Sequence, residues 1–97
     1  MTVDKVEARA LLTRELAQYR GRPFADLKDM IGGVKVIAVQ GPSGVEYQIE
    51  VEVFFDDPRA KANLRVLGSI DDGRLPGAMF PLSESFILAP DGRIVGE

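Results

Sequence analysis

Acidic side chains gather at two predicted loops and are the residues of this sequence best suited to chemistry. They form two pairs of consecutive residues, Asp56 with Asp57 and Asp71 with Asp72. Clustered carboxylates can hold a hard cation such as Ca²⁺ or Mg²⁺, because these ions need several oxygen ligands at once. Neither pair has the spacing of a calcium-binding loop, and an aspartate at a turn before glycine usually hydrogen-bonds its own backbone. The two pairs therefore define a candidate ligand or cation loop, with a structural turn as the competing interpretation.

Cysteine and histidine are both absent from the 97 residues. Without cysteine there is no disulfide, no thiolate zinc site and no thiol nucleophile. Without histidine the commonest general base and metal ligand near neutral pH is missing. The serines have only Lys or Asp as activating bases, and no Ser-x-x-Lys spacing occurs. We therefore predict no catalytic residue, no metal site and no cofactor, and we rank a carboxylate-based hydrolase last among the functions considered.

The charge and the apolar runs limit the classes of partner. A net charge of −3 disfavours nucleic acid, because neutralising phosphates supplies most non-specific affinity. No apolar run approaches the ~18 residues that span a bilayer, so no membrane partner is expected. Residues 1–7 include acids where a signal peptide would have a basic stretch followed by an apolar one. A cytoplasmic location is the resulting expectation.

The amino-terminal third of the chain predicts two helices. Residues 4–20 begin with Asp4 and Glu7, which have the spacing of a capping box. At about 100° per residue, one face of this helix gathers apolar side chains, namely Ala8, Leu11, Leu12, Leu16 and Tyr19. A second, short helix is predicted over about 24–31, where apolar residues recur at helical spacing.

From residue 34 the period changes to two, which predicts strands. The expected strands are 34–40, 45–55, 63–70, 84–88 and 93–95. Residues 45–55 carry the strongest signal, because apolar and mostly acidic residues alternate along them. If the turn after residue 40 closes symmetrically, Lys35 lies opposite Glu50 on the outer face. Val34, Val36 and Ala38 are then expected on the inner face.

The order of these elements predicts the fold class. Helices followed by consecutive antiparallel strands indicate an α+β domain, and the length allows one domain and not two. We expect residues 1–97 to form a single domain. It consists of an N-terminal helix and a short second helix packed on a curled antiparallel sheet of four to five strands.

The outer sheet face provides a candidate interface. In the expected register four large apolar side chains point away from the helix, namely Ile37, Val39, Phe54 and Leu67. Such a patch marks an interface with another protein or lies under a covering loop. Residues 75–83 contain several apolar side chains that would serve as the cover. Both interpretations stay open at this point.

Several segments of the chain resemble a small bacterial α+β protein family, a domain of unknown function. The segments that carry this resemblance are 41–51, 54–57, 68–73, 81–87 and 90–97. The similarity covers most of the chain from about residue 40 onward. It implies a bacterial origin and a compact α+β fold, and it carries over no activity and no catalytic residue.

Together these observations favour a non-enzymatic protein-interaction module. Its partner would be another protein or a second copy of the chain, which makes a homodimer an expected form. The alternative is a binding protein for a small ligand or a divalent cation that uses the acidic loops.

Overall fold

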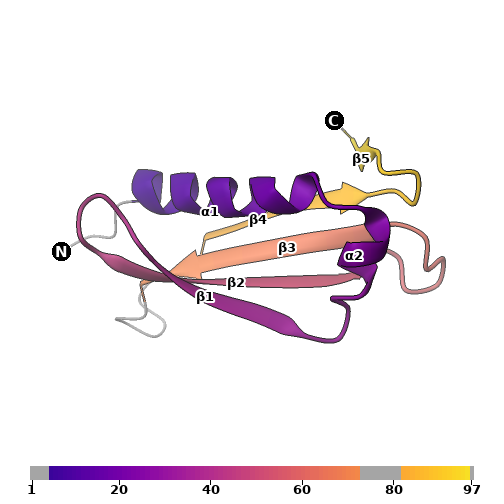
Figure 1. Ribbon diagram of the computed structural model, residues 1–97, viewed down its shortest axis with the longest axis horizontal. Helices are drawn as coiled ribbons and strands as arrows, with labels where there is room; N and C mark the ends of the chain where they lie inside the picture. The colour runs from indigo at the N-terminus through magenta and orange to yellow at the C-terminus, as the bar shows by residue number, and fades with distance from the viewer. Residues whose placement is uncertain (1–4, 73–81, 97) are drawn as a thin grey trace.

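Two helices lie on one face of a five-stranded antiparallel sheet in the computed structural model, which describes residues 5–72 and 82–96 (Figure 1). The elements are α1 Lys5–Arg20, α2 Phe24–Lys28, β1 Val34–Gln40, β2 Glu46–Phe55, β3 Leu64–Asp71, β4 Leu82–Leu88 and β5 Ile94–Val95. Each strand pairs with the next one along the chain, so the order is β1-β2-β3-β4-β5 and the sheet is open. The predicted α+β architecture is confirmed.

Helix α1 packs its apolar stripe against β3 and β4. Four of the five predicted residues are buried, namely Ala8, Leu12, Leu16 and Tyr19, and Leu11 is half-buried at the margin of the core. Gly68 in β3 permits this close approach, because a Cβ there would stand 3.0 Å from methyl carbons of both Leu12 and Leu16. At the β4 side, the Thr13 hydroxyl donates a hydrogen bond of 2.7 Å to the Glu84 carboxylate. Helix α1 thus lies over the half of the sheet that contains β3 and β4.

Helix α2 is shorter than the predicted segment 24–31. It ends at Lys28, and the N–H groups of Met30 and Ile31 then bond to carbonyls three residues back, which tightens the chain into turns. Gly32, with a φ of 97°, completes the reversal that leads into β1. Among residues 5–72 and 82–96 we find no helix with the length and apolar character needed to cross a membrane.

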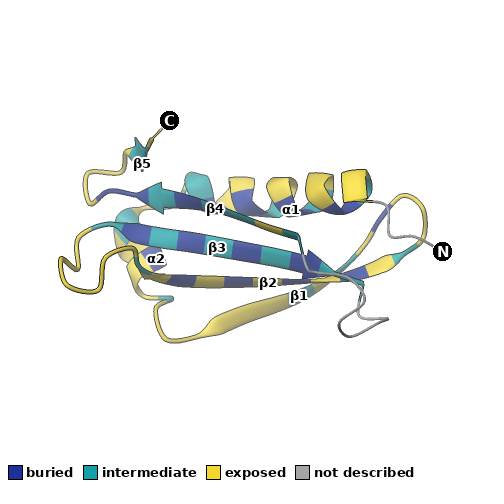
Figure 2. Ribbon diagram, turned by 180° about the vertical axis from the view of Figure 1, so that it is seen from behind, coloured by how far each residue is buried: buried dark blue, intermediate teal, exposed yellow. Residues whose placement is uncertain are grey.

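Strand β2 shows the predicted alternation in full. Four of its helix-facing side chains are at most 2% exposed, namely Tyr47, Ile49, Val51 and Val53, and the fifth, Phe55, is half-buried. The residues between them are exposed, so β2 alternates between buried and exposed colours in Figure 2. Strand β1, in contrast, is exposed along most of its length. The core therefore lies between α1 and the strands β2, β3 and β4.

The predicted register between β1 and β2 is wrong by one residue. Lys35 lies opposite Val51 and not opposite Glu50, and Ile37 lies opposite Ile49. Directly opposed residues of an antiparallel pair share a face. The side chains of Lys35, Ile37 and Val39 therefore lie on the helix-facing side. The outer side of β1 carries Val34, Val36 and Ala38, which had been expected inside.

The turn between the two strands explains this shift. The Gly41 N–H donates to the Val45 carbonyl and the Gly44 N–H donates to the Gly41 carbonyl, both at 2.9 Å. Three residues therefore form the loop, and Gly44 has a φ of 91°. The two-residue alternative needs a positive φ at its first position, but Pro42 holds φ near −65°. Proline at this position selects the longer loop, and the longer loop shifts the register.

Candidate functional site

Apolar side chains cross the outer face of the sheet in a diagonal line, which we call the apolar row. Its members are Val34, Val36, Phe54, Leu67, Ile87 and Val95. Val34 and Leu67 both lie opposite Glu52, so Phe54 is a diagonal neighbour of each. Diagonal neighbours are about 7–8 Å apart, which is within reach of an aromatic ring. The row thus connects all five strands across a face that is otherwise mainly polar.

The row is most exposed at its β1 end. Val34 is 54% exposed, Val36 is 52% exposed and Phe54 is 36% exposed. Leu67, Ile87 and Val95 are half-buried. Within the part of the chain that the structure describes, both helices lie on the opposite face of the sheet (Figure 1).

The predicted interface residues divide between the two faces. Phe54 and Leu67 lie on the outer face, as expected. Ile37 and Val39 lie on the helix-facing side and pack against the margin of the core, so their expected outward position is wrong. Sequence reasoning missed Val34 and Val36 as outer residues. The signal that would have found them is the proline in the turn.

The structure describes only the last two residues of the segment 75–83, which was expected to cover the outer face. Residues 75–81 of the predicted covering segment 75–83 fall outside the described residues. Leu82 is described, and it lies opposite Ile70 on the helix-facing side of the sheet. Leu82 therefore packs toward the core and does not cover the apolar row.

Strand β1 is an edge of the sheet. It pairs with β2 on one side, and no other described segment pairs with it. Because the Gly41 N–H points toward β2, alternation directs the backbone groups of the even-numbered residues to the edge. These residues are Val34, Val36, Ala38 and Gln40. Their N–H and C=O groups are in position to pair with another strand.

The two edges of the sheet are built differently. Natural edge strands are usually very short, charged or interrupted by proline, since a long apolar edge invites pairing with another chain. Strand β5 has two residues and fits that rule, whereas β1 has seven residues and a single charge. That charge is Lys35, whose Nζ lies 5.8 Å from the centre of the Tyr19 ring. Lys35 therefore extends toward α1 and not out from the edge.

Arg65 is a fixed polar group beside the apolar row. It lies opposite Phe54 on one side and Ile87 on the other. Its guanidinium binds the Asp56 carboxylate through Nε at 2.9 Å and Nη2 at 2.8 Å, and it donates to the Ser85 hydroxyl at 2.8 Å. These contacts hold the guanidinium against the sheet between two apolar residues.

The acidic pairs of the candidate cation loop are not brought together. Asp56 and Asp57 follow the last residue of β2, in the loop that leads into β3. Asp71 is the last residue of β3, and Asp72 follows it. The length of β3 separates the two pairs by roughly 25 Å. Asp57 accepts a hydrogen bond of 2.9 Å from the Arg59 N–H, which is the contact expected of a structural turn. The described residues contain no group of three or more potential metal ligands.

Glu7 joins α1 to the β1–β2 turn, a role that the sequence did not reveal. Its carboxylate accepts hydrogen bonds from the Ser43 N–H at 2.9 Å, the Ser43 hydroxyl at 2.6 Å and the Tyr47 hydroxyl at 3.0 Å. The Ser43 hydroxyl, then the Ser43 N–H, and to a lesser degree the Tyr47 hydroxyl hold the pKa of Glu7 below its ordinary value of 4.5. Asp4, its predicted capping partner, lies outside the described residues.

An open groove lies beside this contact, between α1 and the β1–β2 turn. Its volume is about 600 Å³. It is lined by Val6, Glu7, Ala10, Leu11, Arg14, Pro42 and Ser43. The walls are mainly apolar, and Arg14 adds a cation.

Comparisons with known proteins leave the function to be argued from geometry. No protein-family model matches this chain, and searches of curated proteins and of solved structures found no match either. The resemblance to a small bacterial family stays a prediction.

Proposed function

We propose that this chain is a non-enzymatic protein-interaction module that binds a protein through the β1 edge and the adjoining apolar row. The observation that carries this proposal is the exposure of Val34 and Val36, each more than half exposed on a seven-residue edge strand. An edge of this kind is normally guarded. Its lack of guarding charges is understandable if a protein partner covers it.

The geometry supports a known mode of recognition. An extended segment can add to a sheet edge, where main-chain hydrogen bonds provide affinity and alternate side chains provide specificity. The edge-facing backbone groups of β1 can provide the main-chain hydrogen bonds, and the apolar row can provide the side-chain specificity. Phe54 offers a partly exposed aromatic anchor, a residue type that is enriched in the core of protein interfaces.

Site-specific photo-crosslinking tests the proposal. A photoreactive phenylalanine analogue is placed at Val36 and, as a matched control, at Gln18, an exposed residue of α1. We expect protein adducts from position 36 and at least tenfold fewer from position 18. The captured protein is then purified, and Val36→Asp should weaken its binding at least tenfold while Gln18→Asp leaves binding unchanged. Equal adduct yields at the two positions would overturn the proposal.

Small-ligand binding in the groove is the second candidate function. The groove has the volume of many ligand sites, and Arg14 beside an apolar wall suits a small apolar carboxylate. Octanoate is a suitable probe. A ligand at a hundred times its dissociation constant adds about 2.7 kcal/mol of stability, so a rise in melting temperature that Arg14→Ala abolishes would favour this function. Ca²⁺, Mg²⁺ and Mn²⁺ in the same series test the cation alternative.

A further inference from the structure

We infer that the partner is a second copy of this chain, whose β1 pairs antiparallel with β1 so that two five-stranded sheets become one continuous sheet. This inference rests on the proposed function and names its occupant. The pairing is centred on Ile37, the middle residue of Val34–Gln40. Symmetry, backbone hydrogen bonding, charge and a cavity at the start of the strand support this pairing.

Symmetry fixes the faces in such a dimer. The two-fold axis of an antiparallel strand pair is perpendicular to the sheet, so each residue lies opposite a residue of the same parity. Helix-facing residues therefore meet helix-facing residues, and the helices of both copies lie on the same side of the joined sheet. With the axis at Ile37 the two strands overlap over their full length. Any other centre leaves part of each edge unpaired.

The same register satisfies the backbone groups at the edge. Val36 lies opposite the partner's Ala38, and Val34 lies opposite the partner's Gln40. These even-numbered residues are the ones whose N–H and C=O groups point away from β2. Each such group finds a partner across the axis. On the outer face, the Val36 side chains of both copies extend the apolar row into one patch.

The charges are compatible with self-pairing. Strand β1 has no acidic residue although the chain carries a net charge of −3. Its one charge, Lys35, lies opposite the partner's Val39. The two copies of Lys35 are four residue positions apart, roughly 14 Å, which exceeds the screening length of about 8 Å at physiological ionic strength. No like charges are therefore brought into contact by the pairing.

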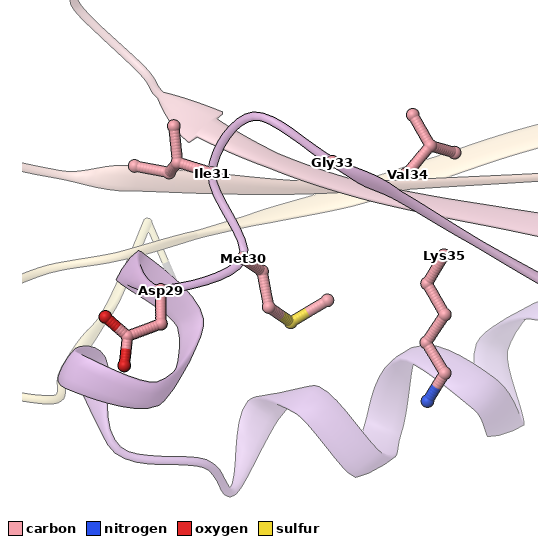
Figure 3. Close-up of a pocket in the computed structure, with 6 residues that line it drawn as sticks. All are labelled: Asp29, Met30, Ile31, Gly33, Val34 and Lys35. Carbon is pink, nitrogen blue, oxygen red and sulfur yellow. The ribbon is translucent and has the colours of Figure 1, made fainter.

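A cavity at the start of β1 gives the partner strand a place to pack. It has a volume of about 430 Å³ and is lined by Asp29, Met30, Ile31, Gly33, Val34 and Lys35. In Figure 3 the side chains of Met30 and Lys35 extend toward the helices, whereas Val34 extends the other way. The partner's Val39 lies opposite Lys35 on the helix-facing side. Its isopropyl group therefore packs beside the Met30 side chain and the alkyl stem of Lys35.

The size of the contact predicts its strength. The surface area buried by a seven-residue strand pair with one side-chain contact on each flank is smaller than the ~1,200 Å² typical of stable complexes. We therefore expect the dimer to be reversible. It is also closed, because a two-fold contact consumes β1 in both copies. The remaining edge strand, β5, has only two residues and offers little for further growth.

A cysteine pair tests the register directly, since the chain has no cysteine of its own. Across the axis, Ile37 and its copy form a non-hydrogen-bonded pair with Cα atoms about 4.5 Å apart, within disulfide range. We expect Ile37→Cys to give at least tenfold more covalent dimer on mild oxidation than Val34→Cys. Val34 is the stringent control, because it is more exposed but lies roughly 20 Å from its own copy in this register. Equal yields, or more dimer from Val34→Cys, would overturn the register.

Sedimentation velocity from about 1 µM to 1 mM tests the contact in the unmodified chain. We expect a monomer–dimer equilibrium that Ala38→Pro weakens at least tenfold, because it removes an edge-facing N–H and leaves the β2 ladder intact. Ala38→Val keeps the N–H and should keep the dimer. If Ala38→Pro fails to fold, Val36→Lys replaces it, since its two copies bring like charges together across the axis. A chain that stays monomeric at 1 mM would overturn the inference.

The two proposals fail in distinguishable ways. Adducts at position 36 with a different protein, together with a monomeric purified chain, would leave the interaction module standing and remove the second copy as its partner. Absence of position-specific adducts would remove both.

Discussion

Strands β1 and β2 pair along the whole of β1, yet their side chains are distributed in opposite ways. Strand β2 separates its residues strictly, with a buried apolar side under the helices and an exposed side of Glu and Gln before Phe54. Strand β1 carries apolar residues on both sides, and one charge, Lys35. A one-residue slip of β2 would place carboxylates in the core, whereas the same slip of β1 exchanges one mainly apolar set for another.

This difference shows what determines each strand's orientation. Burial of Tyr47, Ile49 and Val51 fixes the faces of β2, so its side-chain pattern is enough to orient it. The faces of β1 are fixed by the length of the turn that precedes β2. The covered half of the sheet, strands β2, β3 and β4 under the helices, is therefore stabilised by packing. The edge half, strand β1, is positioned by backbone geometry and by the hydrogen bonds of Glu7 to Ser43.

The largest effect is expected in the covered half. Leu16→Ala removes a fully buried side chain that packs over Gly68 and should cost about 2–5 kcal/mol of unfolding free energy. The matched variant in the edge half, Ile37→Ala, should cost about 1–2 kcal/mol because Ile37 is only partly buried. Urea denaturation at several protein concentrations measures both, since self-association would couple stability to concentration. Equal losses would contradict the division into two halves.

A second test adds volume where α1 approaches the sheet. Gly68→Val inserts methyl groups against Leu12 and Leu16 and should cost about 1–3 kcal/mol. Its control is Ser69→Val, one residue along β3 on the outer face, which should change stability by less than about 0.5 kcal/mol. Thermal denaturation compares the two. A harmless Gly68→Val would mean that α1 does not need the close approach.

A third test addresses the tie between α1 and the β1–β2 turn. Glu7 has a lowered pKa in the folded chain, so its ionised form adds stability that is present above pH 4.5 and is lost as the pH falls toward the folded-state pKa. Glu7→Gln should therefore lower the melting temperature at pH 7, and the difference from the parent chain should shrink below pH 4.5. Glu15→Gln, on the same helix, is the control for loss of one negative charge. A difference that does not change with pH would count against the carboxylate contact.

The smallest effect is expected where the two halves meet. The Tyr19 hydroxyl is buried and has no hydrogen-bond partner among residues 5–72 and 82–96. Tyr19→Phe removes that unsatisfied group and should leave stability unchanged or raise it by up to about 1 kcal/mol. The ring stays in place beneath the cations of Arg22 and Lys35. A loss of more than about 1 kcal/mol would show that the hydroxyl has a partner outside those residues.

Much of the fold could be predicted from the sequence, because periodicity reports burial directly. The helical stripe of Leu12 and Leu16 and the alternation of Tyr47, Ile49 and Val51 gave the two layers and their facing sides. The order of the strands also followed, since short turns favour pairing of consecutive strands.

The candidate site was only partly predictable, because it depends on a turn and on contacts between distant residues. Symmetric closure of the turn 41–44 places Ile37 and Val39 on the wrong face, because Pro42 selects the loop 42–44 and shifts the register by one residue. Glu7 binds Ser43, 36 positions away along the chain, and no periodic pattern reports such a contact. The acidic pairs were grouped by composition, whereas the length of β3 holds them apart.

The hairpin loop 42–44 has a further consequence for how this surface can change. Replacing Pro42 with glycine would remove its constraint on φ and permit the two-residue connection, in which Gly41 pairs with Gly44. The register would then shift by one residue, and Lys35, Ile37 and Val39 would face outward while β2 and the core stay as they are. A single substitution in a solvent-exposed turn would thus give the same strand sequence a different recognition surface, and the outward lysine would oppose pairing with another strand. The specificity of this edge is encoded in hairpin length as much as in the side chains of the strand.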